Sequence, residues 1–243
     1  MNSKFNEVVI AAAVRTPIGT FKGSLKNIKA DQLGSIVIKE VINRANINSK
    51  DIDEVILGQV LTAGSGQNPA RQASINAGLP KSIPAYLVNQ VCGSGLRSVI
   101  LGFQTIKLNE AKYIISGGQE NMSITPHTLF YRNENKLSED KLTDTMTHDG
   151  LIDAFKKYHM GITAENIAEK LNISRKEQDN FALKSQHKTQ LALKQNKFKD
   201  ELISVNLDGS FLNSDEHPRK DLRAEDLEKL KSAFKENGTV TAG

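Results

Sequence analysis

The hydrophobic and polar positions of this chain follow two different periods over its first 120 residues. Short, nearly continuous apolar runs are typical of strands buried on both faces of a sheet. Between them, apolar residues recur every three or four positions, which indicates amphipathic helices. The predicted order is strand 7–15, helix 30–47, strand 54–61, helix 68–78, strand 85–91, helix 94–110 and strand 113–120. Alternation of this kind predicts an α/β fold.

Two of the predicted helices carry a clear apolar face. The positions on these faces are spaced three or four residues apart, so they lie along one side of a helix with 3.6 residues per turn. They are Leu33, Ile36, Val37 and Val41 in the first helix, and Leu96, Val99, Ile100 and Phe103 in the second.

The pattern becomes polar and rich in lysine after residue 120, which predicts an inserted, mainly helical subdomain. Thr163 is suited to the N-cap of one helix. Ser174 and Glu177 have the spacing of a capping box, which predicts a second helix that runs to about Gln195. A strand at 201–207 and a helix at 224–234 then resume the layered pattern. The predicted domains are 1–120, the insertion 121–200, and the return 201–243.

Composition narrows the class of protein. The 243 residues are 38% hydrophobic, without an apolar stretch long enough to span a membrane or an N-terminal signal-peptide core, so we expect a cytoplasmic protein and no membrane partner. The net charge is +4, but acidic residues nearly balance basic ones and few aromatics accompany the lysines. Nucleic acid is therefore a disfavoured partner. The basic surplus would suit a phosphorylated small molecule, or simply a solvated surface.

Cys92 is the only cysteine, so no internal disulfide can form, and no Cys and His spacing resembles a zinc site. It follows the strand at 85–91 and precedes the helix at 94–110, with Gly93 and Gly95 permitting a sharp turn. A helix N-terminus favours a thiolate and offers N–H groups to an oxyanion. Cys92 is therefore either a nucleophile or a small packing residue at the end of a core strand.

Six motifs occur in order along the chain: RTPIGTFKGSL at 15–25, GQNPARQA at 66–73, NQVCGSGLRSV at 89–99, SGGQENMS at 116–123, YHMGITAENIA at 158–168 and DEHPRKDL at 215–222. With these motifs the chain resembles the thiolase family over essentially its whole length, and within it the acetyl-CoA acetyltransferase branch. The resemblance implies a layered α/β half, a mixed sheet with helices on both faces, and the inserted loop subdomain.

The resemblance also implies an activity. Cys92 would take an acetyl group from acetyl-CoA, and the carbanion of a second acetyl-CoA would attack this acetyl-enzyme to form acetoacetyl-CoA, or the reverse. Coenzyme A thioesters would be substrates, with no cofactor and no metal. A homodimer or homotetramer that serves fatty acid metabolism is the expected form of the intact enzyme.

Five further site residues follow only from the resemblance. Leu151, His159 and Met160 would line the pocket for the acyl and pantetheine groups. Arg219 would lie near the adenine and phosphates of coenzyme A, and Ala242 in a loop that also contacts coenzyme A. Read without the family, His159 is an ordinary loop residue, Met160 fills a gap in a core, and Arg219 is a solvated charge.

The chain departs from the family in one respect. It contains no G-H-P motif, no N-E-A-F motif and no second cysteine, which thiolases carry in their C-terminal half. The sequence is therefore expected to be an N-terminal half that is inactive alone as a condensing enzyme, although Cys92 could still be acetylated slowly. Two alternatives stay open: a non-catalytic subunit that docks to a complementary C-terminal chain, and a related condensing enzyme for other acyl thioesters.

Overall fold

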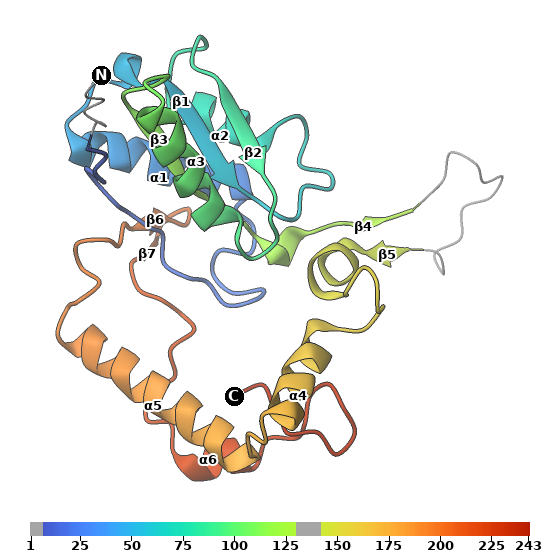
Figure 1. Ribbon diagram of the computed structural model, residues 1–243. Coiled ribbons are helices and arrows are strands. Elements are labelled where there is room, and N and C mark those ends of the chain that lie inside the picture. The colour runs from blue at the N-terminus through green and yellow to red at the C-terminus, as the bar shows by residue number, and fades with distance from the viewer. Residues whose placement is uncertain (1–6, 130–141) are drawn as a thin grey trace, which may run out of the picture. The chain divides into compact units, whose positions relative to one another are not determined.

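The computed structural model describes residues 7–129 and 142–243 (Figure 1), which divide into two compact units. Unit 1 comprises Met1–Gly150 and Glu201–Glu216, and unit 2 comprises Leu151–Asp200 and His217–Gly243. These units differ in extent from the predicted domains. Residues 121–150, predicted as part of the insertion, belong to unit 1, and residues 217–243, predicted as part of the layered domain, belong to unit 2. Parts of the predicted domains, 1–6 and 130–141, lie outside the described residues.

The elements of unit 1 follow the predicted order from residue 30 onward. The helices are α1 (Ala30–Ala45), α2 (Pro69–Asn76) and α3 (Ser94–Lys107), with 3-10 turns η1 (Ser49–Asp51) and η2 (Met122–Ile124) and a π-helix η4 (Met146–Leu151) that ends in unit 2. The strands are β1 (Glu54–Gly58), β2 (Ala85–Val88), β3 (Ile114–Gly118), β4 (His127–Thr128), β5 (Thr143–Asp144), β6 (Val205–Asn206) and β7 (Phe211–Leu212).

The central sheet has the order β2-β1-β3, and both of its strand pairs are parallel. The α/β class is thus confirmed, but this sheet is parallel rather than mixed. Antiparallel pairing occurs in the separate two-stranded ribbons β4-β5 and β6-β7. The strand predicted at 201–207 forms only as β6, and the ribbon it makes with β7 is its sole sheet among the described residues.

Helices cover both faces of the sheet, as predicted (Figure 1). On one face, Val55 and Leu57 of β1 pack with Ile38 of α1 and Ala73 of α2 in the main hydrophobic core. On the other face, α3 lies against β1 and β3 through small residues, since its buried positions are Ser94, Ser98 and Gly102.

The apolar face predicted for α3 forms, but it points away from the sheet. Leu96 is 69% exposed and Phe103 is 47% exposed, and Val99 and Ile100 are also exposed. The sheet packs against the opposite side of α3, where the side chains are small enough for the backbones of the helix and the sheet to approach closely. An exposed apolar face of this kind is a candidate surface for interaction or self-association.

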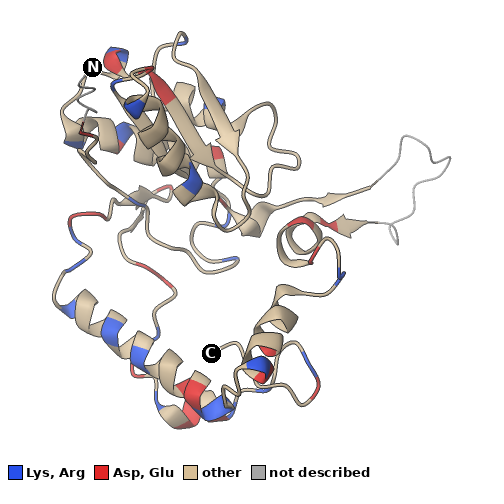
Figure 2. Ribbon diagram, in the orientation of Figure 1, with Lys and Arg blue, Asp and Glu red and all other residues tan. Residues whose placement is uncertain are grey.

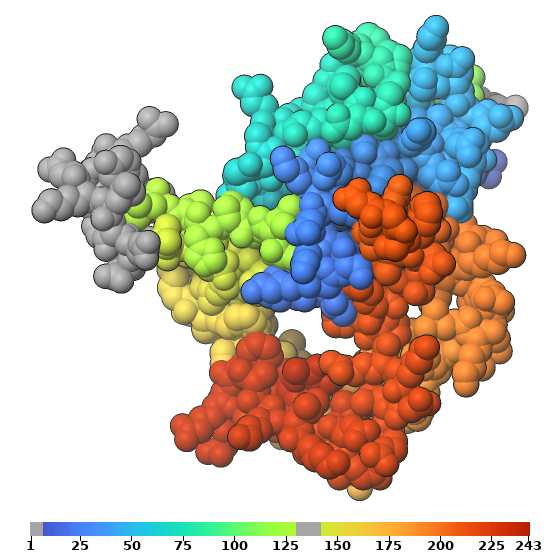
Figure 3. Space-filling view, turned by 180° about the vertical axis from the view of Figure 1, so that it is seen from behind, coloured from blue at the N-terminus to red at the C-terminus, as the bar shows by residue number. Residues whose placement is uncertain are grey.

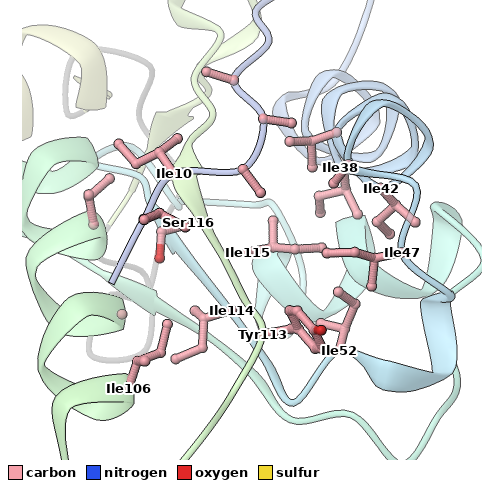
Figure 4. A pocket seen from close by; sticks show the side chains of 18 of the residues that line it. Ile10, Ile38, Ile42, Ile47, Ile52, Ile106, Tyr113, Ile114, Ile115 and Ser116 are labelled. Carbon is pink, nitrogen blue, oxygen red and sulfur yellow. The ribbon is translucent and has the colours of Figure 1, made fainter. Parts of the chain in front are cut away.

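The strand predicted at 7–15 is wrong. Residues 7–14 form no strand, and only Arg15 makes a bridge, to Leu202. A cavity of about 510 Å³, lined almost entirely by apolar side chains, lies between this segment, α1, α3 and β3 (Figure 4). Ile10 is 77% exposed. Residues 7–14 have an apolar composition that suits a strand, but a strand forms only when its N–H and C=O groups pair with a neighbour.

The edge of β3 that faces away from β1 is also unpaired. The Gln119 N–H donates to the Gly58 carbonyl, so odd-numbered residues of β3 face β1. By strand alternation, Ile114 and Ser116 direct their N–H and C=O groups to the other edge. Within the described residues these backbone groups have no hydrogen-bond partner. The sheet therefore ends at an open edge beside the cavity.

Two acidic residues of the DEHPRKDL motif fasten the RTPIGTFKGSL loop in unit 1. Asp215 accepts a bidentate pair of hydrogen bonds from Arg15, at 2.7 and 3.0 Å, and a third from the Ile18 N–H at 2.8 Å. Glu216 accepts from the Thr20 N–H at 3.0 Å and from Ser24. Figure 3 shows the segment that ends at these residues lying against the N-terminal loop. Two motifs 200 residues apart thus form one structural clamp.

Unit 2 is helical, with α4 (Met160–Lys170), α5 (Arg175–Lys194) and α6 (Ala224–Glu228). The capping box of α5 is confirmed, since Ser174 and Glu177 bond reciprocally, and Gln195 is its C-cap. Thr163 is not an N-cap, because α4 begins three residues earlier with His159 as its cap. The helix predicted at 224–234 ends at Glu228.

Lys and Arg residues are spaced along α5 (Figure 2). Across the described part of the chain, no helix is both long and apolar enough to cross a membrane.

The clamp generates a stability prediction. Burial would raise the pKa of Asp215, but hydrogen bonds from Arg15 and Ile18 outweigh it and hold this pKa below its usual value. A depressed carboxyl pKa stabilises the fold above the unfolded-state pKa, near 3.9, and that contribution is lost as pH falls through the folded value. We expect Asp215→Asn to lower the free energy of unfolding at pH 7 by about 2 kcal/mol.

Urea unfolding followed by circular dichroism at pH 7 and at about pH 3 measures this difference. The gap between wild type and Asp215→Asn should shrink at the lower pH. Glu236→Gln, at an exposed position, is the control and should change neither value. An equal gap at both pH values would contradict the assignment.

Candidate active site

Cys92 lies in the turn between β2 and α3, and its side chain is exposed. The alternative that it is a buried packing residue is therefore wrong. Helix α3 begins two residues later, at Ser94, as predicted. The turn itself was predicted to rest on Gly93 and Gly95, but Gly93 has an ordinary φ of −82°. The left-handed residue is Val91, with a φ of 49°.

The first turn of α3 presents free hydrogen-bond donors next to Cys92. The N–H groups of Gly93 and Ser94 are used within the turn, where they donate to the carbonyls of Gln90 and Val91. The N–H groups of Gly95 and Leu96 have no acceptor among the described residues. Together with the positive end of the helix dipole, these donors favour a negative charge at this position.

The close contact of α3 with the sheet fixes where this donor group lies. A Cβ atom on Gly58 would come within 2.5 Å of the Ser94 carbonyl carbon and 2.6 Å of the Gly95 nitrogen. Ser98 donates to the Gly117 carbonyl at 2.7 Å. Gly118 also lies against the helix, since a Cβ atom there would be 3.5 Å from the Gly95 Cα atom.

Glu120 follows β3 and is a structural hydrogen-bond partner. Its carboxylate accepts from the N–H groups of Val60 and Leu61 at 2.8 and 3.3 Å. Burial raises its pKa, and these two N–H groups act in the opposite direction. The carboxylate therefore holds the chain that leaves β1.

Leu151, His159 and Met160 come together in unit 2. An antiparallel bridge joins Ile152 to His159, so Leu151 and Met160 lie at neighbouring positions of the two segments. The His159 ring accepts from the Gly161 N–H at 2.9 Å through Nδ1 and stacks on Phe234 with ring centroids 4.8 Å apart. His159 is thus a fixed helix cap rather than a free loop residue.

Arg219 and Ala242 also lie in unit 2 and are exposed. The Arg219 backbone is held to α5, because its N–H donates to Gln186 at 3.0 Å and its carbonyl accepts from Gln190 at 3.2 Å. The segment that leads to Ala242 is held to α4 by the buried Glu165, which accepts from the N–H groups of Thr239 and Val240. Cys92 lies in the other unit.

Three residues of the turn were not identified from the sequence: Asn89, Val91 and Ser94. Asn89 and Ser94 bond to the backbone of Val91. Asparagine directly after a strand is a signal for a side chain that bonds its own backbone two residues on, and could have been used. In the described residues, no group of three or more His, Cys, Asp or Glu side chains could hold a metal ion.

The fold and this turn define a class: an α/β protein with an exposed cysteine at a strand-to-helix turn. Residues 8–243 match the thiolase N-terminal domain. The chain is 48% identical to the acetyl-CoA acetyltransferase of Paracoccus denitrificans and 51% identical to that of Chromobacterium violaceum, in each case over 98% of this chain and 62% of the relative. A probable acetyl-CoA acetyltransferase of Escherichia coli is 49% identical over the same shares.

The chain therefore belongs to the thiolase family. It spans about 62% of the length of the relatives it matches.

The contact at Gly58 generates a prediction. Gly58→Ala would place a methyl group into the first turn of α3, so we expect a loss of about 1–3 kcal/mol in the free energy of unfolding and slower alkylation of Cys92 by iodoacetamide. Gly95→Ala is the matched control, since a Cβ there meets nothing within 4 Å. Equal effects of the two substitutions would show that α3 is not held by this contact.

Proposed function

We propose that this chain is the nucleophile-bearing part of an acetyl-CoA acetyltransferase. The observation that carries the proposal is that Cys92 is exposed and directly precedes the first turn of α3, where the N–H groups of Gly95 and Leu96 have no acceptor among the described residues. A thiolate at this position can attack a thioester, and the N–H donors can stabilise the oxyanion that forms. The relatives are named as acetyl-CoA acetyltransferases, so we take acetyl as the acyl group and coenzyme A as its carrier.

The reaction has two stages. The Cys92 sulfur forms a bond to the carbonyl carbon of acetyl-CoA, and the bond from that carbon to the sulfur of coenzyme A breaks, which releases the coenzyme A thiolate. A base then removes an α-proton from a second acetyl-CoA. The resulting carbanion attacks the acetyl group on Cys92, acetoacetyl-CoA forms, and the cysteine thiolate is released. Thiolysis is the same sequence reversed.

The second stage needs residues that are absent from this sequence. The G-H-P motif, the N-E-A-F motif and the second cysteine, which the resemblance assigns to proton transfer and to the site, do not occur among the 243 residues. We therefore assign acetyl transfer to this chain alone, and condensation to its combination with a chain that supplies those groups. The intact enzyme, with both halves in one protomer, would be a homodimer or homotetramer.

The substrate contacts proposed in unit 2 rest on the family. Leu151, His159 and Met160 would line the acyl and pantetheine pocket, and their proximity supports a shared role. Arg219 would contact the phosphates of coenzyme A, which suits an exposed guanidinium next to the basic helix α5. Ala242 would contact coenzyme A from the C-terminal segment. In the same proposal, the enzyme acts in the cytoplasm and needs no cofactor.

A docking subunit is the second candidate, and two observations favour a complementary chain in either case. The apolar face of α3 is exposed at Leu96, Val99, Ile100 and Phe103. The open edge of β3 lies beside an apolar cavity. Both surfaces would be covered by a polypeptide that packs on α3 and pairs with β3.

Acetyl transfer can be measured directly. Purified chain is incubated with acetyl-CoA, and its intact mass is determined together with the coenzyme A released. We expect one acetyl group on the native chain and none on Cys92→Ser. A folded native chain that gains no acetyl group would refute the nucleophile assignment, and a docking subunit would then be the better account.

The exposed face of α3 predicts self-association. Leu96→Gln removes an exposed apolar side chain, so it should lower aggregation in dynamic light scattering and leave the melting temperature unchanged. Leu191→Gln is the control, because Leu191 is 55% exposed but lies on α5. An equal drop in aggregation for both variants would show that the α3 face has no special role.

A further inference from the structure

The turn before Cys92 depends on one backbone conformation that its residue disfavours. Val91 has a φ of 49°, in the left-handed region. A β-branched side chain is sterically unfavourable there, so the surrounding structure must impose this conformation. Val91 precedes Cys92 directly, so its φ and ψ set the direction in which the chain presents the cysteine.

Side chains hold the peptide groups on both sides of Val91. Asn89 accepts a hydrogen bond from the Val91 N–H through Oδ1, at 2.9 Å. Ser94 donates to the Val91 carbonyl through Oγ at 2.6 Å, and its N–H donates to the same carbonyl at 3.1 Å. The two hydrogen bonds to the carbonyl come from the first residue of α3, whereas the acceptor for the N–H is the residue that directly follows β2.

Asn89 is itself tied to the sheet. Its Nδ2 donates to the Val60 carbonyl at 3.4 Å, and the Val60 N–H donates to Glu120 at 2.8 Å. A chain of hydrogen bonds therefore runs from the segment after β3, through the segment after β1, to the turn. It connects the turn to two strands of the sheet.

We propose that Asn89 is a positioning residue for Cys92: its hydrogen bond to the Val91 N–H holds Val91 left-handed and keeps the sulfur beside the free N–H groups of α3. The inference rests on the proposed function for its reaction, but the geometry belongs to the turn alone. Asn89 acts through Val91 and is not assigned a contact with substrate.

The test compares Asn89→Ala with Asn89→Ser. Alanine removes the acceptor, whereas serine offers an uncharged oxygen that can take the same backbone bond. We expect acetylation of Cys92 by acetyl-CoA to slow about fivefold in Asn89→Ala and less than about twofold in Asn89→Ser. Both melting temperatures should stay close to that of the wild type, because Asn89 is exposed.

A second background separates positioning from a general structural role. Glycine adopts a positive φ without steric cost, so Val91→Gly removes much of the need for Asn89. In that background Asn89→Ala should slow acetylation less than about twofold. An undiminished loss in the Val91→Gly background would overturn the proposal, as would full activity of Asn89→Ala in the wild-type background.

Alkylation of Cys92 by iodoacetamide, measured on the same variants, distinguishes the two proposals. If wild type takes no acetyl group but its alkylation rate falls in Asn89→Ala and recovers in Asn89→Ser, the proposed function fails and the positioning role stands. If wild type is acetylated and neither rate responds to Asn89, the positioning role fails and the proposed function stands.

Discussion

The close approach of α3 to the sheet is the constraint on which the candidate site depends. It is possible only because Gly58 on β1 and Ser94, Ser98 and Gly102 on α3 leave no bulk between the two backbones. The hydrogen bond from Ser98 to the Gly117 carbonyl fixes the helix along the strand. Two features follow from this close approach: the N-terminus of α3 lies at the end of β1, and the apolar side of the helix points outward.

This arrangement explains where sequence patterns succeeded and where they did not. Hydrophobic spacing predicted α3 and its apolar face correctly, but it could not show which side the sheet would take. Serine and glycine at positions 94, 98 and 102 give no hydrophobic signal, although their spacing of four places them on one side of the helix. A stripe of small residues is recognised as a packing face only when a neighbouring glycine, here Gly58, is known to meet it.

The failed strand at 7–15 has a different cause. Its composition suits a buried strand, yet a strand exists only through hydrogen bonds to a neighbour, and residues 7–14 have none within the described chain. Capping at Ser174 and Glu177 was predicted correctly because both partners lie within four residues. His159, Met160 and Arg219 could be singled out only through family resemblance, since the roles proposed for them depend on a ligand that local sequence does not encode.

The two stages of the proposed reaction make different demands on the fold. Acetyl transfer needs an exposed sulfur and N–H donors, and a short stretch from Asn89 to Leu96 provides both once β1, β2 and α3 are assembled. Carbanion formation needs a base positioned over a second thioester, which is a long-range arrangement. The exposed face of α3 and the open edge of β3 lie in the same unit as Cys92. A chain that covers them would therefore complete the fold in the unit that holds the nucleophile.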